Sequence, residues 1–145
     1  MHNQDSNTNG PIILIEDDTD DHNFFLTAFR NLKYPNEVLF FTNGEEALAF
    51  LNKTHLTPFL ILSDINMPKI DGLALRAMVR TNELLDHKCI PYLFFSTASD
   101  RKIVTEAYKL SVQGFFMKQN SISELEKTIS VIMEYWKRCI APNDF

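Results

Sequence analysis

Residues 59–68, Phe-Leu-Ile-Leu-Ser-Asp-Ile-Asn-Met-Pro, carry the strongest structural signal in this sequence. The apolar run Phe59–Leu62 is short and is followed by turn residues, which is typical of a strand buried on both faces of a parallel sheet. Asp64 then lies where this strand leaves the sheet. Because ligands of open parallel sheets bind at the carboxyl ends of the strands, we expect Asp64 to be a metal ligand or a nucleophile.

Strands and helices alternate on both sides of this stretch. Further short apolar runs predict strands at residues 11–15, 38–42, 90–95 and 114–117. Apolar periodicity and helix-start signals predict five helices, at about residues 20–34, 45–51, 72–85, 101–110 and 121–138. This alternation indicates an α/β fold, in which a five-stranded parallel sheet carries helices on both faces.

Local signals at the helix ends add detail to this prediction. Thr19, Asp20 or Asp21 is expected to cap the first helix, and Ser99 or Asp100 the fourth. Ser121 with Glu124 has the spacing of a capping box at the start of the last helix. The helix over residues 72–85 is expected to turn four apolar side chains toward the core, namely Leu73, Ala77, Met78 and Leu84.

Composition predicts the domain boundaries and argues against several classes of protein. The polar residues 1–10 are expected to form a disordered tail, residues 11–138 one domain, and residues 139–145 a C-terminal tail. The net charge of −5 and the scattered basic residues argue against binding to nucleic acid or to a membrane surface. Neither a signal peptide nor a stretch of about 20 apolar residues is visible, so we expect a cytoplasmic protein.

Polar side chains follow four of the predicted strands. Parallel strands end at the same edge of a sheet, so these groups should lie close together. They are Glu16 and Asp17 after the first strand, Asp64 after the third, Ser96 and Thr97 after the fourth, and Lys118 after the fifth.

The three carboxylates of this set predict a magnesium site. Glu16, Asp17 and Asp64 would repel one another, and a hard divalent cation with oxygen ligands would relieve the repulsion. The backbone carbonyl of Asn66 is a further candidate ligand. Asp64 would keep one oxygen free to attack phosphorus, as carboxylates do in aspartyl-phosphate enzymes, and Lys118 would supply positive charge to the product.

Four motifs together resemble the receiver domain of two-component response regulators, of the single-domain chemotaxis-regulator type. They are residues 12–18 (IILIEDD), residues 64–72 (DINMPKIDG), residues 96–98 (STA) and residues 114–118 (GFFMK). The resemblance covers nearly the whole chain. It implies a flavodoxin-like fold with strand order 2-1-3-4-5, an order for which the general rule on such sheets itself names a receiver.

The resemblance also implies roles for particular residues. Asp64 would be the phospho-acceptor, with Mg²⁺ as cofactor. Lys118 would correspond to the lysine that is invariant in the family. Ser96 would be the switch hydroxyl, because its spacing from Lys118 and from the strand's proline is the usual one, whereas Thr97 is displaced by one. Phe115 falls at the aromatic switch position.

Partners and activity follow from the same resemblance. A sensor histidine kinase or a histidine phosphotransfer protein would be the phosphoryl donor, and a downstream protein or a second copy of the chain would sense the change. The only enzymatic activity implied is Mg²⁺-dependent self-phosphorylation and self-dephosphorylation. No effector domain follows the last helix, so a stand-alone regulator is expected.

Two departures from the family pattern concern the loops around the site. Gln119 replaces the usual proline after Lys118, so the peptide bond between them is either trans or a strained cis bond. Ala98 cannot orient a hydrolytic water, which predicts ordinary to slow self-dephosphorylation.

Two other functions remain open on the sequence. A pseudo-receiver would keep the fold and bind partners without phosphorylation, although the acids and the lysine are complete. A metal-dependent phosphohydrolase would need a second carboxylate two residues after Asp64, where Asn66 stands.

Overall fold

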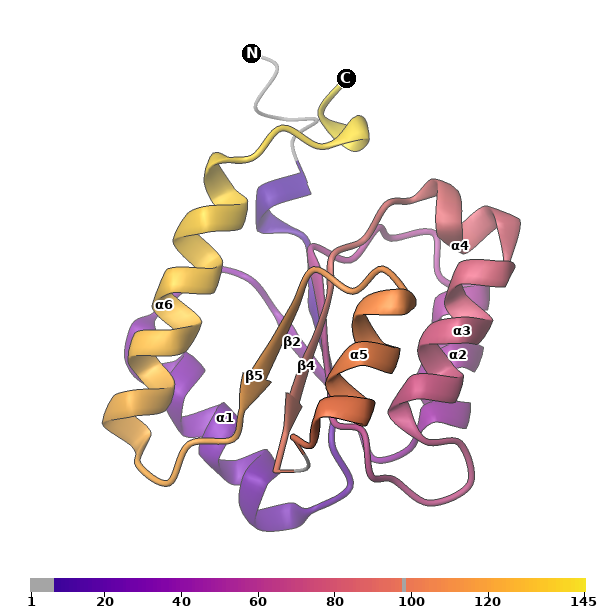
Figure 1. The fold of residues 1–145 in the computed structure, drawn as a ribbon. Helices are drawn as coiled ribbons and strands as arrows, with labels where there is room; N and C mark the ends of the chain where they lie inside the picture. The colour runs from indigo at the N-terminus through magenta and orange to yellow at the C-terminus, as the bar shows by residue number, and fades with distance from the viewer. Residues whose placement is uncertain (1–6, 98) are drawn as a thin grey trace.

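The computed structural model describes residues 7–97 and 99–145 (Figure 1). The strands are β1 (Ile12–Ile15), β2 (Val38–Phe41), β3 (Leu60–Ser63), β4 (Tyr92–Ser96) and β5 (Gly114–Met117). The α-helices are α1 (Thr19–Leu32), α2 (Gly44–Lys53), α3 (Gly72–Thr81), α4 (Glu83–His87), α5 (Arg101–Lys109) and α6 (Ile122–Arg138). Short 3₁₀ helices, η2 (Asn7–Asn9) and η3 (Pro142–Asp144), lie near the ends.

The strands form one parallel sheet in the order β2-β1-β3-β4-β5, which confirms the expected order. Successive side chains of a strand point to opposite faces, and both faces are covered. In β1, Ile12 and Leu14 pack with the apolar faces of α1 and α6. Ile13 and Ile15 pack on the other side, with residues of α2, α3, α4 and α5. Figure 1 shows the same division of helices between the two faces.

The helix predicted over residues 72–85 is divided in two, so the described residues contain six α-helices rather than five. Asn82 has extended backbone angles and ends α3, and its side chain caps α4 by accepting a hydrogen bond from Leu85 N at 3.1 Å. The break changes which side chains face inward. Leu75, Val79 and Leu85 are buried.

The inward face predicted for this segment was therefore wrong at two positions. Met78 and Leu84 are 41% and 78% exposed, and Leu73 and Ala77 are half-buried. The apolar residues of this segment occur on two sides of the helix, so periodicity alone selects no single face.

Caps position the helices as expected, with one correction. The side chains of Asp100 and Ser121 cap α5 and α6, as predicted, and that of Asn43 caps α2. The cap of α1 is Asp18, not Thr19, Asp20 or Asp21. The helix therefore begins directly after the acidic residues that follow β1.

Described residues of both terminal segments make hydrogen bonds. The Asn36 side chain is buried, and its Nδ2 donates to the carbonyls of Thr8 at 2.9 Å and Gly10 at 2.8 Å. The backbone N–H of Asn7 donates to Asp144 Oδ1 at 3.2 Å, which joins the two terminal segments. Residues 7–10 and 142–144 therefore pack against the domain, while residues 1–6 lie outside the described residues.

Residues 7–10 and the C-terminal segment lie at the end of the sheet where the strands begin, opposite the end where they finish (Figure 1). Within the described ranges, no helix combines the length and apolar character needed to cross a bilayer.

Candidate functional site

The register of the sheet brings the predicted residues to one edge. Ile15 pairs with Ser63 and Ser96 pairs with Met117, so the residues that follow them leave the sheet side by side. The backbone N–H of Asp64 donates to Ile15 O at 3.0 Å, and that of Lys118 donates to Ser96 O at 3.1 Å. Both side chains thus start from positions held by the strand ladder.

Three carboxylates converge at this edge, as predicted. One oxygen from each of Glu16, Asp17 and Asp64 lies within 4.8 Å of the others. Glu16 and Asp64 are 3% and 7% exposed, whereas Asp17 is exposed to solvent. Octahedral Mg²⁺ with bonds of about 2.1 Å spaces its oxygens about 3–4 Å apart, so this donor set fits such an ion with small movements.

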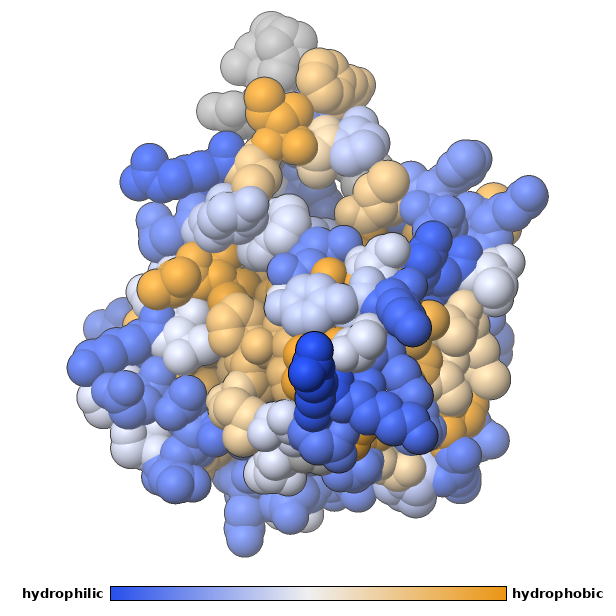
Figure 2. All heavy atoms as spheres, in the orientation of Figure 1, coloured by the Kyte–Doolittle hydropathy of each residue, from blue (hydrophilic) through white to orange (hydrophobic). Residues whose placement is uncertain are grey.

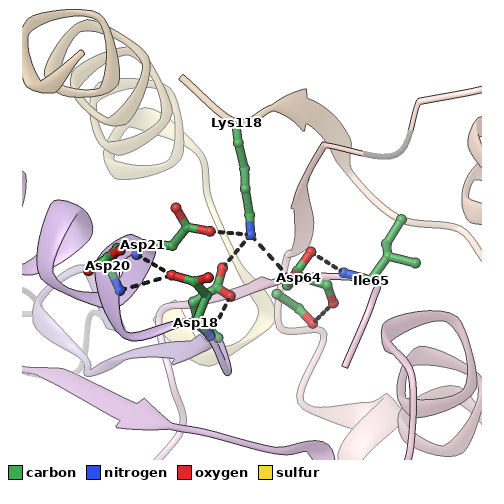
Figure 3. Close-up of polar contacts among 8 residues, drawn as sticks. Asp18, Asp20, Asp21, Asp64, Ile65 and Lys118 are labelled. Carbon is green, nitrogen blue, oxygen red and sulfur yellow. Dashed lines mark hydrogen bonds and ion pairs between the residues drawn. The ribbon is translucent and has the colours of Figure 1, made fainter. Parts of the chain in front are cut away.

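Lys118 lies at the centre of the charged groups (Figure 3). Its Nζ is 2.8 Å from Glu16 Oε1, 2.7 Å from Asp21 Oδ2 and 3.2 Å from Asp64 Oδ2. An ammonium group has three donors, and these three carboxylates match that number. The lysine side chain is only 12% exposed, so it is held within the acidic cluster.

The titration of this cluster reflects its burial. Burial raises the pKa of Glu16 to about 7, with a further increase from the Asp64 charge, against the opposing hydrogen bond from Lys118. Burial alone would lower the pKa of Lys118, but the hydrogen bonds with Asp21 and Glu16 and the nearby charges outweigh it and raise that pKa above its ordinary value. Lys118 is therefore a cation at neutral pH.

Asp64 itself is oriented by the loop that follows β3. Its Oδ1 accepts a hydrogen bond from Ile65 N at 2.7 Å, and the hydroxyl of Ser63 donates to the Asp64 carbonyl at 2.8 Å. The first residue of α3, Gly72, closes this loop by donating its N–H to Ile65 O at 2.7 Å.

The contact at Gly72 leaves no room for a side chain. A Cβ there would contact the Asp64 carbonyl oxygen and would lie 2.8 Å from Ile65 Cα. Glycine is needed at this position because two backbone segments approach closely behind the nucleophile candidate.

The remaining predicted residues lie around the edge with less defined roles. Ser96 is fully buried at the end of β4, and Thr97 after it is exposed. Asn66 is exposed in the loop after Asp64. Phe115 is half-buried and packs against the cluster on the α3 and α5 side, with its ring centroid 6.1 Å from that of Phe94.

The two departures from the family pattern can be placed in part. The peptide bond between Lys118 and Gln119 is trans, like all others in the described residues. Ala98 lies outside the described residues.

Asp21 is the functional candidate that sequence reasoning missed. It was considered only as a helix cap, yet it makes the shortest contact of the three carboxylates with Lys118. The rule about strand ends could not find it, because Asp21 lies in the first turn of α1 rather than directly after a strand.

Curated proteins similar to this chain include signalling proteins of bacteria. Response regulator Rcp1 of Synechocystis sp. is 28% identical over 137 residues, which cover 91% of this chain and 92% of Rcp1. Chemotaxis protein CheY-3 of Vibrio cholerae is 26% identical over 128 residues, which cover 88% of this chain and 95% of that protein.

Solved structures and a family profile agree with these similarities. The phosphorylated cyanobacterial phytochrome response regulator RcpA has a TM-score of 0.81 at 30% identity, covering 91% of this chain and 97% of its own. The Mn²⁺-bound form of Rcp1 has a TM-score of 0.78 at 27% identity, and the match covers 90% of this chain and 97% of the Rcp1 chain. The profile of the response regulator receiver domain matches residues 12–130, and the chain accordingly belongs to that family.

Proposed function

We propose that the chain is a stand-alone response regulator that accepts a phosphoryl group on Asp64. The observation that supports this most directly is the setting of that carboxylate. Asp64 lies between two other acids, Glu16 and Asp17, and the ammonium group of Lys118, 3.2 Å away. An acidic cation site beside a fixed positive charge suits a carboxylate that gains a dianionic group.

The phosphoryl donor would be the phosphohistidine of a sensor histidine kinase or of a histidine phosphotransfer protein. An oxygen of Asp64 forms the new bond to phosphorus while the bond from phosphorus to the imidazole nitrogen breaks. The nitrogen keeps the electron pair and takes up a proton. Lys118 is placed to pair with the phosphoryl oxygens, since its Nζ already contacts Asp64 Oδ2.

The cofactor would be Mg²⁺. Glu16, Asp17, Asp64 and the backbone carbonyl of Asn66 are the groups that would hold it, and the spacing of the three carboxylates supports this. Bound there, the ion would offset negative charge on the transferring group. The Mn²⁺-bound form of Rcp1 is a related receiver with a divalent cation.

The output would be a change in protein contacts. A phosphoryl group on Asp64 adds about −1.5 to −2 charges. Ser96 would move toward it and Phe115 would turn inward, which would reshape the face formed by residues 101–118. Figure 2 shows apolar residues over β5, between α5 and α6, bordered by hydrophilic ones. Met117 on β5 and Val131 on α6 are 45% and 68% exposed, so a partner protein or a second copy has apolar surface to bind.

Incubation with acetyl phosphate and Mg²⁺, followed by intact-mass measurement, tests the proposal. The wild-type chain should gain one phosphoryl group, and Asp64→Asn should gain none. Glu106→Gln, which changes an exposed acid on α5, should behave as wild type. An equal gain in Asp64→Asn would contradict the assignment. A folded wild type with no gain would favour the alternative of a pseudo-receiver that binds partners without phosphorylation.

A further inference from the structure

A cavity of about 390 Å³ lies at the end of the sheet opposite Asp64. Residues just before β3, β4 and β5, such as Phe59, Pro91 and Gln113, form its floor, and the segment 139–144 lines it on the side of the termini. Figure 1 shows the C-terminal segment at this end of the molecule. The volume falls within the range of small-molecule sites, about 300–1,000 Å³.

Two guanidinium groups meet at the wall of this cavity. Arg76 donates from Nε to Leu110 O at 3.0 Å and from Nη2 to Ser111 O at 2.9 Å. Arg80 donates from Nη1 to the hydroxyl of Ser111 at 3.0 Å. Both arginines come from α3 and are four positions apart, a spacing at which like charges on a helix destabilise each other.

Neither arginine has a carboxylate within 4.0 Å in the described ranges. Arg76 is nevertheless only 7% exposed, and its other contact is with an aromatic ring, that of Tyr92, 5.2 Å from the guanidinium carbon. Burial lowers the pKa of Arg76 and the charge of Arg80 lowers it further, whereas Tyr92 and the charge of Asp86 raise it. Burying a cation without a carboxylate in direct contact is costly, which favours an anion beside this pair.

The acids at the cavity form no ion pair with the two arginines in the described part of the chain. Beside the two arginines, the acids among the described lining residues are Asp86 and Asp144. The carboxylate of Asp144 is engaged with backbone N–H groups, those of Asn7 at 3.2 Å and Ala141 at 2.8 Å, so it holds the terminal segments together. Asp86 is exposed to solvent.

The rest of the cavity wall is largely apolar. Val79, Leu85 and Ile90 line it from α3, α4 and the segment before β4, and Trp136 and Ile140 line it from the side of α6. We propose that this cavity binds a small amphipathic carboxylate, with its head group at the Arg76 and Arg80 guanidinium groups and its apolar body against Leu85, Ile90 and Trp136. The guanidinium N–H groups that do not donate to residues 110 and 111 can donate to a carboxylate, and the wall matches a hydrocarbon or aromatic body.

The chain carries its own probe for this site, because Trp136 is its single tryptophan. Octanoate should change Trp136 fluorescence along a saturable curve. Octanamide has nearly the same shape without the charge, and it should bind at least tenfold more weakly. Arg80→Gln, at an exposed position, should weaken octanoate at least tenfold, whereas Arg30→Gln on α1 should not.

The same titrations can overturn the proposal. Equal affinity for octanoate and octanamide, unchanged affinity in Arg80→Gln, or no saturable change in the folded wild type would each do so. Amide signals in a ¹H–¹⁵N spectrum provide a second readout, since octanoate should shift those of residues 76–90, 111–113 and 136–144. Shifts confined to other residues would place the ligand elsewhere and contradict the assignment. Phosphoryl labelling of Asp64 in Arg80→Gln should match wild type, which separates this site from the proposed function.

Discussion

At the scale of single residues, one lysine contacts three of the acids in the charged cluster. Lys118 contacts Asp21 at 2.7 Å and Asp64 at 3.2 Å, so the helix acid competes with the proposed phospho-acceptor for the ammonium group. This competition gives Asp21 a role that its position near the start of α1 does not suggest. It also makes the cluster open to tests by single substitutions that change charge and little else.

Asp21→Asn should speed phosphorylation of Asp64 by acetyl phosphate. Weakening one charged hydrogen bond frees Lys118 to move toward Asp64, and a difference of about 1 kcal/mol corresponds to about fivefold in rate. Mass measurements at timed intervals would follow the labelling. Asp20→Asn is the matched control, because Asp20 is the adjacent acid and makes no ion pair with Lys118 within the described ranges. Slower labelling in Asp21→Asn than in this control would show that Asp21 assists transfer.

Asp17→Asn should stabilise the metal-free chain and abolish its response to Mg²⁺. Asp17 lies within the acidic group but forms no ion pair in the described part of the chain, so its charge mainly adds repulsion, of order 0.5–1 kcal/mol. Urea unfolding with a chelator and then with Mg²⁺ would measure both effects. Wild type should gain stability on adding Mg²⁺, since the ion binds only the folded state. A variant that keeps the wild-type Mg²⁺ gain would exclude Asp17 as a ligand.

The raised pKa of Glu16 predicts a definite pH dependence. The folded chain holds a proton on Glu16 up to about pH 7, whereas the unfolded chain releases it near 4.5. Between these values the folded state binds more protons, so this residue's contribution to stability falls as the pH rises, by up to about 3 kcal/mol. The unfolding free energy of wild type minus that of Glu16→Gln, measured with chelator from pH 4.5 to 7.5, should therefore fall as the pH rises, because glutamine has no proton to lose in this range. If the unfolding free energies of wild type and Glu16→Gln changed in parallel with pH, Glu16 would not hold a proton in this range.

At the scale of helices and strands, apolar periodicity predicted the strands and most helices because each element buries one stripe or both faces. It failed at α3 and α4, where apolar residues such as Met78 and Leu84 occur on the solvent side. The break depends on Asn82, which ends one helix and caps the next, and nothing in the spacing of apolar residues marks it. The cap of α1 was misassigned for a related reason, since several adjacent polar residues can each serve as a cap.

The junction between β3 and α3 is the element on which the geometry of Asp64 depends. Gly72→Ala should reduce both stability and labelling, because a Cβ would collide with the Asp64 carbonyl and come within 2.9 Å of the Phe94 ring. Overpacking of this kind costs about 1–3 kcal/mol. Urea unfolding and phosphoryl labelling would measure the two effects. Gly44→Ala at the start of α2 is the control, where the closest contacts are 3.3 Å and involve Ile70. Equal effects of the two substitutions would contradict a special role for Gly72.

At the scale of the whole molecule, the two ends of the sheet differ in how far they could be predicted. The end that carries Asp64 follows from a rule about parallel sheets, since Glu16, Asp64 and Lys118 each come directly after a strand. The opposite end is built by contacts between segments that carry no motif, such as Asn36 with Thr8. Its cavity depends on where the chain ends fold back, and local sequence patterns do not contain that information.

Removal of residues 1–10 should therefore destabilise the domain, although their composition suggests a dispensable tail. The buried Asn36 side chain would lose both of its acceptors, and Lys137 would lose the Thr8 carbonyl that it contacts at 3.1 Å. Together these losses should lower the free energy of unfolding, measured with urea, by about 1–3 kcal/mol.

A double-mutant cycle separates this effect from a general effect of truncation. Asn36→Ala should cost about 1–2 kcal/mol in the full chain and much less in the truncated one, because the truncation has already removed its partners. Additive costs would show that the contacts of Asn36 with residues 8 and 10 contribute nothing. Labelling of Asp64 should survive the truncation, since the removed contacts lie at the other end of the sheet. Loss of labelling in a folded truncated chain would instead show that the two ends are coupled.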